Sequence, residues 1–153
     1  RPNRFYLGQD IVMPGTEKIG LGHIGFMIDS SGSVSTDELK QFAAEVNDIF
    51  SELEPEKVTL IWFDGVAYDP EEFEPGDELI FEAKGRGGTT FTEPFKKATE
   101  FDLDDEFDIV IFLTDGGDSH YPEEPPYPVI WASTGAMGGG GPDFGEFLPI
   151  KFD

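Results

Sequence analysis

The sequence predicts an α/β fold with a mostly parallel central sheet, one antiparallel edge strand and helices on both faces. Apolar runs of strand length recur along the chain, and two of them end in Asp or Thr-Asp, at residues 29 and 114–115. A helical pattern follows the first run, which gives a strand, loop and helix unit. That run, His23–Asp29, is almost continuously apolar, as expected of a central strand that is covered on both faces.

Length and composition limit the classes of protein to consider. The 153 residues fit one domain, which we expect to span residues 1–153. With 32 acidic against 10 basic residues, the formal charge of −22 repels nucleic acids and anionic lipid surfaces, so we expect neither as a partner. There is no Cys, which excludes disulfides and thiolate metal sites, and no apolar run reaches the ~20 residues of a membrane span. We therefore expect a cytoplasmic protein, although such acidity is also typical of halophile and some phage proteins.

The first 19 residues predict an extended N-terminal arm. They contain Pro2 and Pro14 and show no helical period. The chain opens with Arg-Pro-Asn-Arg and no Met, so we expect it to be the C-terminal part of a longer polypeptide, with a processed terminus as the alternative.

The spacing of apolar residues predicts a helix over Thr36–Leu53. Ser35 and Glu38 form a capping-box pattern at its start, and Glu54-Pro55 ends it. Its apolar face is made of Leu39, Phe42, Ala43, Val46, Ile49, Phe50 and Leu53.

The next segment predicts a hairpin at one edge of the sheet. Lys57–Phe63 is rich in β-branched and aromatic residues, and the Asp64-Gly65 turn follows it. Residues 66–73 should return as an antiparallel edge strand, because Pro70 cannot take part in a central ladder. A weak strand is expected near residues 79–81.

The second half of the chain repeats the strand and loop pattern. A glycine loop over 85–91 ends in Thr89 and Thr90, whose hydroxyls can cap a helix over about 91–101. Buried strands are expected at 107–113 and 129–132, and residues 135–142 contain too many glycines for a helix. A last strand over 147–152 should lie at a sheet edge because of Pro149.

Five oxygen-bearing side chains should meet where parallel strands end. They lie on three separate loops and are Asp29, Ser31, Ser33, Thr89 and Asp115. The carboxyl edge of the strands is where open α/β sheets bind ligands. Oxygen ligands of mixed charge suit a hard divalent cation, so we expect Mg²⁺ first, with Mn²⁺ or Ca²⁺ as alternatives. The competing interpretation is an ordinary helix cap at residues 29–33, which leaves Thr89 and Asp115 as coincidences.

These motifs resemble the von Willebrand factor A (VWA) domains, which carry a metal-ion-dependent adhesion site (MIDAS). The matching stretches are DSSGS at 29–33, GGT at 87–89 and TDG at 114–116, in the family's order. The resemblance implies a Rossmann-like VWA fold, here compact and with few helices. It also implies that Ser31 and Ser33 coordinate Mg²⁺ directly, while Asp29, Thr89 and Asp115 bind directly or through water.

A narrower resemblance is to the VWA-like domain that follows a metallopeptidase-like domain in bacterial and phage proteins. It is carried by the opening RPNR, by GRGGTTF and by PPYPVIWASTG at 125–135. Relatives usually have Asp after the Thr of GGT, whereas this chain has Thr90, which removes a carboxylate near the predicted metal.

The resemblance implies a noncatalytic, Mg²⁺-dependent protein-binding module. Its metal would capture an Asp or Glu of a partner protein, and bacterial VWA proteins of this type suggest a MoxR-type AAA+ ATPase. One alternative is a Mg²⁺-dependent hydrolase or phosphotransfer enzyme with Asp29 as the nucleophile. Another is a metal-free scaffold for an upstream metallopeptidase-like domain. We expect no catalysis by this domain itself.

Overall fold

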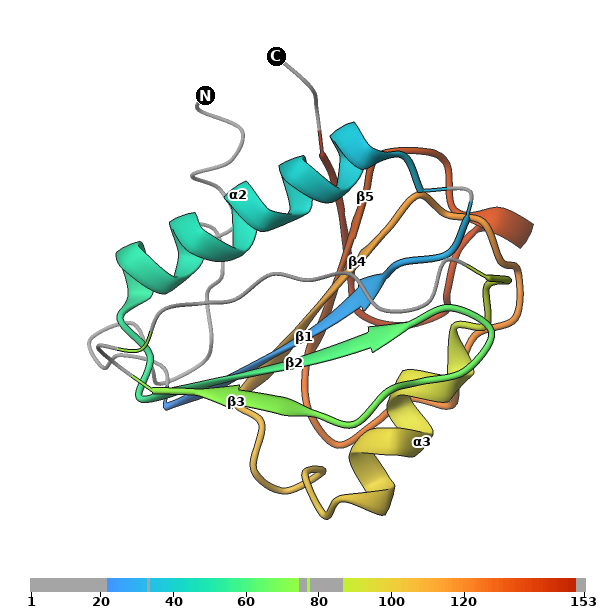
Figure 1. Cartoon of the computed structure of the whole chain (residues 1–153). Coiled ribbons are helices and arrows are strands. Elements are labelled where there is room, and N and C mark those ends of the chain that lie inside the picture. Colours follow the sequence, from blue (N-terminus) through green and yellow to red (C-terminus); the bar gives the residue numbers. More distant parts are fainter. Residues whose placement is uncertain (1–21, 33, 75–76, 78–86, 151–153) are drawn as a thin grey trace.

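The computed structural model describes residues 22–32, 34–74, 77 and 87–150 (Figure 1). A six-stranded sheet lies between helix α2 (Thr36–Leu53) on one face and helix α3 (Thr92–Glu100) on the other. The predicted compact α/β fold with helices on both faces is confirmed. Neither helix combines the length and apolar character needed to cross a bilayer. The expected N-terminal arm, the weak strand near 79–81 and Ser33 lie outside the described residues.

The strand order places the start of the fold in the middle of the sheet. The strands are β1 (His23–Asp29), β2 (Lys57–Phe63), β3 (Glu71–Phe73), β4 (Ile109–Thr114), β5 (Val129–Ser133) and β6 (Glu146–Pro149). They lie in the order β3-β2-β1-β4-β5-β6, and only the β2–β3 pair is antiparallel. The chain builds outward from β1 to β3 and then returns to β4 on the other side of β1. The ends of β1 and β4 therefore form the topological switch point, where α/β sheets bind ligands.

Helix α2 has the predicted bounds and the predicted cap. The Ser35 hydroxyl accepts the Glu38 N–H at 3.0 Å, and the Glu38 carboxylate accepts the Ser35 N–H at 2.9 Å. Phe42, Val46 and Ile49 are buried against the sheet. The helix begins three residues after position 33, so the cap fixes where the loop after β1 ends.

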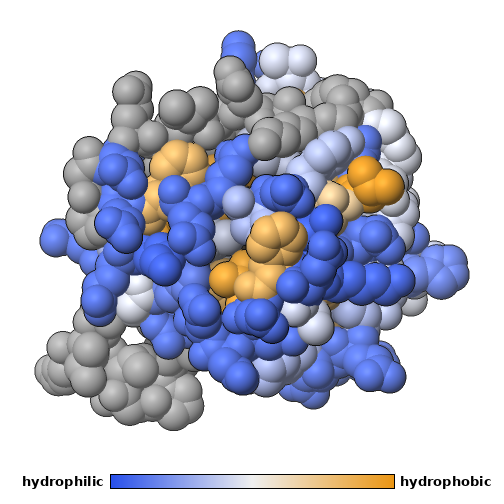
Figure 2. All heavy atoms as spheres, turned by 60° about the horizontal axis from the view of Figure 1, so that its bottom comes forward, coloured by the Kyte–Doolittle hydropathy of each residue, from blue (hydrophilic) through white to orange (hydrophobic). Residues whose placement is uncertain are grey.

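Aromatic rings fill the space between the sheet and α3. Phe95 of α3 stacks on Phe112 of β4 with ring centroids 5.6 Å apart, and Trp131 of β5 lies 4.7 Å from Phe112. The Phe107 ring lies over Gly25 of β1, where a Cβ atom would come within 2.7 Å of the ring. Figure 2, which brings the lower side of Figure 1 forward, shows a largely hydrophilic surface with only a few apolar patches. Seven of the twelve phenylalanines among the described residues are buried in the core.

Both edge strands are present, at bounds that differ from the predicted ones. After the turn at Asp64, a bridge pairs Phe63 with Ala67, and regular pairing to β2 resumes only at Glu71–Phe73, just past Pro70. At the other edge, β6 covers Glu146–Pro149 and runs parallel to β5, whereas a strand over 147–152 was predicted; residues 151 and 152 lie outside the described residues. The glycine run at 135–142 contains one short 3-10 turn, η1 (Gly138–Gly140), interrupted by non-helical dihedrals at Gly139.

We predict that Gly25→Ala destabilises the fold, because the new methyl group would overlap the Phe107 ring. Overpacking of a close-packed core costs about 1–3 kcal/mol, which urea denaturation would measure. Gly88→Ala is the matched control, since nothing lies within 4 Å of a Cβ atom there. Adding Phe107→Leu to Gly25→Ala should recover part of the loss, and a single variant as stable as the parent would contradict the packing described here.

Candidate functional site

Asp29 lies at the carboxyl end of β1, and its carboxylate joins β1 to β4. The side chain is fully buried. One oxygen accepts the Ser31 N–H at 2.9 Å, and the other accepts the Thr114 hydroxyl, at the end of β4, at 2.6 Å. The Thr114 hydroxyl in turn accepts the Gly116 N–H at 3.0 Å. The loops that follow β1 and β4 are therefore connected through one carboxylate and one hydroxyl.

The loop after β1 is also tied to the glycine loop that carries Thr89. Ser31 is buried and its hydroxyl hydrogen-bonds Asp29, while the N–H of Gly32 donates to the Gly87 carbonyl at 2.8 Å. Thr89, two residues beyond Gly87, is half-buried. Among the described residues, no hydrogen bond engages the Thr89 side chain, so its hydroxyl is not used by this part of the fold.

Asp64, at the end of β2, holds the glycine loop from the other side. Its carboxylate accepts the N–H groups of Val66 at 3.1 Å and Gly87 at 2.9 Å, and its carbonyl accepts the Thr90 N–H at 2.8 Å. Burial alone would raise the pKa of Asp64, but these hydrogen bonds and one from the Tyr68 hydroxyl hold its pKa below the ordinary value. Asp64 is therefore an ionised residue that fixes the loop.

Asp115 follows β4 in a turn whose next residue, Gly116, has no space for a side chain. Its carboxylate accepts the Gly117 N–H at 3.1 Å, and the side chain is half-buried. Gly116 has φ +87°, and a Cβ atom there would lie 2.1 Å from the Ala136 carbonyl oxygen. Glycine is required at this position on both counts, which explains the Asp-Gly pair in physical terms.

The start of α3 corrects one expectation. The predicted cap by the Thr89 or Thr90 hydroxyl is wrong: the N-cap is Phe91, whose N–H donates to the Asp118 carboxylate at 3.0 Å. Asp118 comes from the loop after β4, so it joins that loop to the glycine loop. A carboxylate also interacts well with the positive end of a helix dipole, which explains why an acid is suited to this place.

The structure thus brings four of the five predicted ligand residues to one edge of the sheet. Asp29, Ser31, Thr89 and Asp115 lie on three loops that hydrogen bonds connect, and Ser33 lies outside the described residues. Sequence reasoning did not anticipate the connecting roles of Thr114, Asp64 and Asp118. The available signal for these three residues was a hydroxyl or carboxylate at or soon after the end of a strand. Their hydrogen-bond partners could not be read from the sequence, because they lie 23–85 residues away along the chain.

This arrangement has its counterpart among known domains. A family described as VWA-like domain (DUF2201) matches residues 24–151. The chain belongs to this family. The match includes all three motif loops and every described strand except the first residue of β1, so the predicted VWA resemblance is confirmed at the level of the domain family. No curated protein matches the sequence.

In this VWA-like domain, burial and a nearby negative charge both disfavour the ionised form of Asp29. Burial raises the pKa of Asp29, the hydrogen bonds from Ser31 and Thr114 lower it, and the negative charge of Asp115 raises it again, with a net upward shift. Within the described part of the chain, no Lys or Arg forms an ion pair with Asp29. A buried carboxylate without a cationic partner is costly, and a bound cation would offset that cost.

The donor set fits a hard cation in its chemistry. In the described ranges, no three His, Asp or Glu side chains form a cluster suited to a metal. The predicted set instead combines two carboxylates with neutral hydroxyls, all oxygen donors, which is the type of ligand that Mg²⁺ takes along with several waters. The Asp29 carboxylate accepts three hydrogen bonds, from the Ser31 N–H, the Ser31 hydroxyl and the Thr114 hydroxyl, which leaves about one of its roughly four lone-pair sites for a cation.

We predict that Asp118→Asn weakens the fold at neutral pH and has little effect in acid. Burial raises the pKa of Asp118, but hydrogen bonds from Phe91, Ser119 and His120 lower it, and together they hold the pKa below its ordinary value. A lowered pKa stabilises the folded state above the unfolded pKa, and this stability is lost as the pH falls through the folded pKa. Loss of a negative charge near the N-terminus of a helix costs about 0.3–1 kcal/mol.

Denaturant unfolding at several pH values would measure this difference. Asp102→Asn serves as the control, because Asp102 is exposed and its left-handed φ of 59° is one that Asn tolerates. A difference for Asp118→Asn that stays constant below the folded pKa would contradict the capping role of the charge.

Proposed function

We propose that this VWA-like domain is a noncatalytic protein-binding module that uses Mg²⁺ to capture an Asp or Glu of its partner. Asp29, Ser31, Ser33, Thr89 and Asp115 would hold the ion, which supplies a positive charge to a carboxylate. The setting we propose is the cytoplasm, with a MoxR-type AAA+ ATPase as the partner that the family resemblance favours. Membership of the VWA-like family supports the broader role of a protein-interaction module.

The observation that carries the proposal is that, among the described residues, no Lys or Arg pairs with the buried Asp29. Asp29 lies next to the negative charge of Asp115, and the hydrogen bonds that it accepts within this part of the chain come from a backbone N–H and two hydroxyls. A fold that needed only a helix cap here would place its capping carboxylate in a more exposed position, as Asp118 shows at α3. The cost of burying Asp29 is explained if a cation binds beside it.

Net charge is no obstacle to capturing a carboxylate. The chain carries a formal charge of −22, which repels an acidic partner at long range. Salt at 0.1 M largely screens this repulsion at separations beyond roughly 10 Å. At contact distance, a divalent ion that is held partly by neutral hydroxyls keeps residual positive charge. Local charge at the ion therefore governs the contact, and the net charge governs only the rate of approach.

The burial of Asp29 also argues against the nucleophile alternative. A carboxylate that attacks phosphorus must reach a phosphate group, which is much larger than a metal ion, and the Asp29 side chain is fully buried. A phosphatase assay with a chromogenic phosphate monoester and Mg²⁺ tests that alternative, and turnover abolished by Asp29→Asn would establish it. The metal-free scaffold alternative requires that no divalent cation bind at all.

We predict that Mg²⁺ and Mn²⁺ raise the melting temperature of the protein relative to EDTA. An ion that binds only the folded state stabilises it by RT ln(1 + [L]/Kd), about 2.7 kcal/mol at a hundredfold excess over Kd. Asp29→Asn should fold, melt in EDTA at or above the parent's temperature because a buried charge is gone, and respond to neither ion. Asp102→Asn, at an exposed position, should keep the full response.

The same variants test partner capture. Binding of a purified MoxR-type ATPase, measured by biolayer interferometry, should require Mg²⁺ and be lost in Asp29→Asn but not in Asp102→Asn. Parent and Asp29→Asn proteins with equal melting responses to Mg²⁺ would refute the proposed ligand set. Metal-independent binding to the ATPase would refute the capture mechanism.

We predict that Thr90→Asp binds Mg²⁺ more tightly and its partner no more tightly. Thr90 is half-buried beside Thr89, and its N–H is fixed by the Asp64 carbonyl, so a carboxylate here adds negative charge near the ion while the loop is retained. Two unit charges ~4 Å apart interact by about 4 kcal/mol at an effective dielectric constant of 20. The same added charge leaves the ion with less attraction for an incoming carboxylate.

Isothermal titration with Mg²⁺ would measure the first effect, with Thr92→Asp as a control that adds the same charge inside α3. Equal Mg²⁺ affinities of the two variants would mean that position 90 has no special relation to the ion.

A further inference from the structure

The half of the sheet around β5 and β6 carries an apolar hollow on the face that holds Trp131. The chain between β5 and β6 forms no α-helix, and its glycine-rich residues 136–145 lie next to this part of the sheet. The hollow has a volume of about 410 Å³, and none of the described residues that line it is charged. Its side-chain lining is Trp131, Ala136, Met137, Pro142, Phe144 and Phe147. Phe147 of edge strand β6 is 51% exposed, although it is a large apolar side chain.

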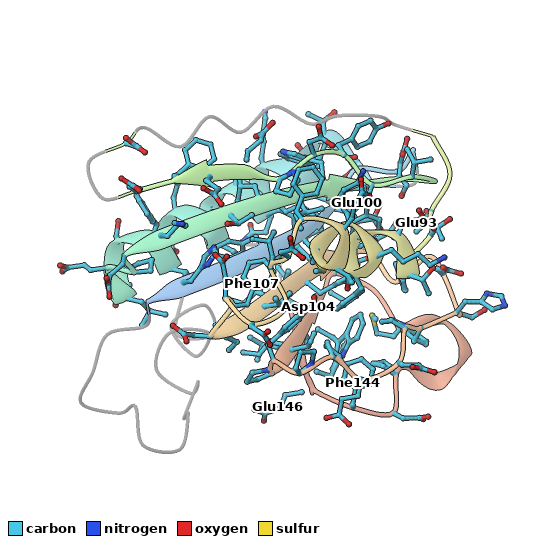
Figure 3. The ribbon with its side chains drawn as sticks, turned by 90° about the horizontal axis from the view of Figure 1, so that it is seen from below. Glu93, Glu100, Asp104, Phe107, Phe144 and Glu146 are labelled. Atoms are coloured by element: carbon cyan, nitrogen blue, oxygen red, sulfur yellow. The ribbon has the colours of Figure 1, made fainter. Side chains whose placement is uncertain are left out.

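A second hollow adjoins the first and has the opposite character. Its volume is about 480 Å³, and it shares Gly141, Pro142 and Phe144 with the apolar one. Its remaining wall contains the exposed acids Glu123, Glu124 and Asp143, and the described part of its lining includes no Lys or Arg. Phe144 thus stands between an uncharged and an acidic hollow, with exposed Glu146 close by in the sequence (Figure 3). We call the two together the double groove.

We propose that the double groove binds a segment of a partner protein in which a large apolar side chain stands next to Lys or Arg. The apolar hollow has the volume of a site for one or two such side chains. The three acids of the adjoining hollow favour a cation and repel an acidic segment. Charge also disfavours a second copy of this chain as the occupant, since each copy carries −22.

This site is separate from the predicted metal centre in the chemistry that it recognises. The metal centre would take a carboxylate, whereas the double groove takes a basic and apolar segment. The metal centre and the double groove are neighbours in the fold. Gly116, next to Asp115, accepts the Gly138 N–H at 3.1 Å through its carbonyl and lies close to Ala136, which lines the apolar hollow. Binding in the groove should nevertheless need no metal, so it is tested in EDTA.

The probe is a fluorescein-labelled synthetic peptide of alternating Phe and Lys, with binding followed by fluorescence anisotropy. Two control peptides replace Phe by Ser or Lys by Glu. We expect binding of the Phe-Lys peptide, weaker binding of the Ser-Lys peptide and none of the Phe-Glu peptide. Phe147→Ala should weaken binding of the Phe-Lys peptide about tenfold, as expected for an apolar contact at the centre of an interface. Phe101→Ala is the matched control, since Phe101 is 43% exposed and outside both hollows.

A second pair of variants tests the acidic hollow. Glu123→Gln with Glu124→Gln should weaken binding and reduce its dependence on salt. Glu52→Gln with Glu56→Gln removes the same charge from exposed positions at the far end of α2 and should change neither. All four residues are exposed, so these variants should remain folded, which melting in EDTA would verify.

Equal loss of affinity in the two Glu pairs would overturn the proposal, because the general negative charge of the protein would then be holding the peptide. Equal loss in Phe147→Ala and Phe101→Ala would also overturn it, because the apolar hollow would then make no specific contribution. Sedimentation of the protein alone adds a further check. Self-association that Phe147→Ala abolishes would show that a second copy occupies the groove and would also overturn the proposal.

Discussion

The hydrogen bond from the Thr114 hydroxyl to Asp29 is the contact on which the edge of this fold depends. It joins the ends of two adjacent parallel strands, β1 and β4, at the point where the strand order reverses. Parallel strands diverge into separate loops at such a point, and backbone pairing cannot hold those loops together. A side-chain pair supplies the connection, and the turn at Gly116 continues it through the same hydroxyl.

Carboxylates hold the surrounding loops by the same means. Asp64 and Asp118 each accept backbone N–H groups from the glycine loop or the start of α3, and each has a lowered pKa as a result. Asp29 differs, because burial and a like charge raise its pKa although it also accepts hydrogen bonds from Ser31 and Thr114. The fold thus stabilises the ionised form of Asp64 and Asp118 by hydrogen bonds. For Asp29 it does not, and a bound cation would stabilise that ionised form.

The sequence was sufficient for the strands, the helices and the motif loops, because each has a local signature. The capping box of Ser35 and Glu38 predicted the start of α2, and Pro70 and Pro149 marked the two edges of the sheet. The cap of α3 could not be predicted, since Asp118 reaches Phe91 from a loop 27 residues further along. The roles of Thr114 and the double groove were equally hidden, because both depend on which strands become neighbours. Local patterns predict elements, and contacts across the sheet decide how their ends are joined.

The two tryptophans of the chain lie on opposite faces of the sheet. Trp62 belongs to the cluster packed by α2, whereas Trp131 belongs to the aromatic cluster packed by α3, and both are fully buried. The intrinsic fluorescence of the protein is therefore the sum of one emitter in each layer. Replacing either indole by Phe leaves a spectroscopic reporter of the other layer alone, so the order in which the two layers loosen becomes an optical observable.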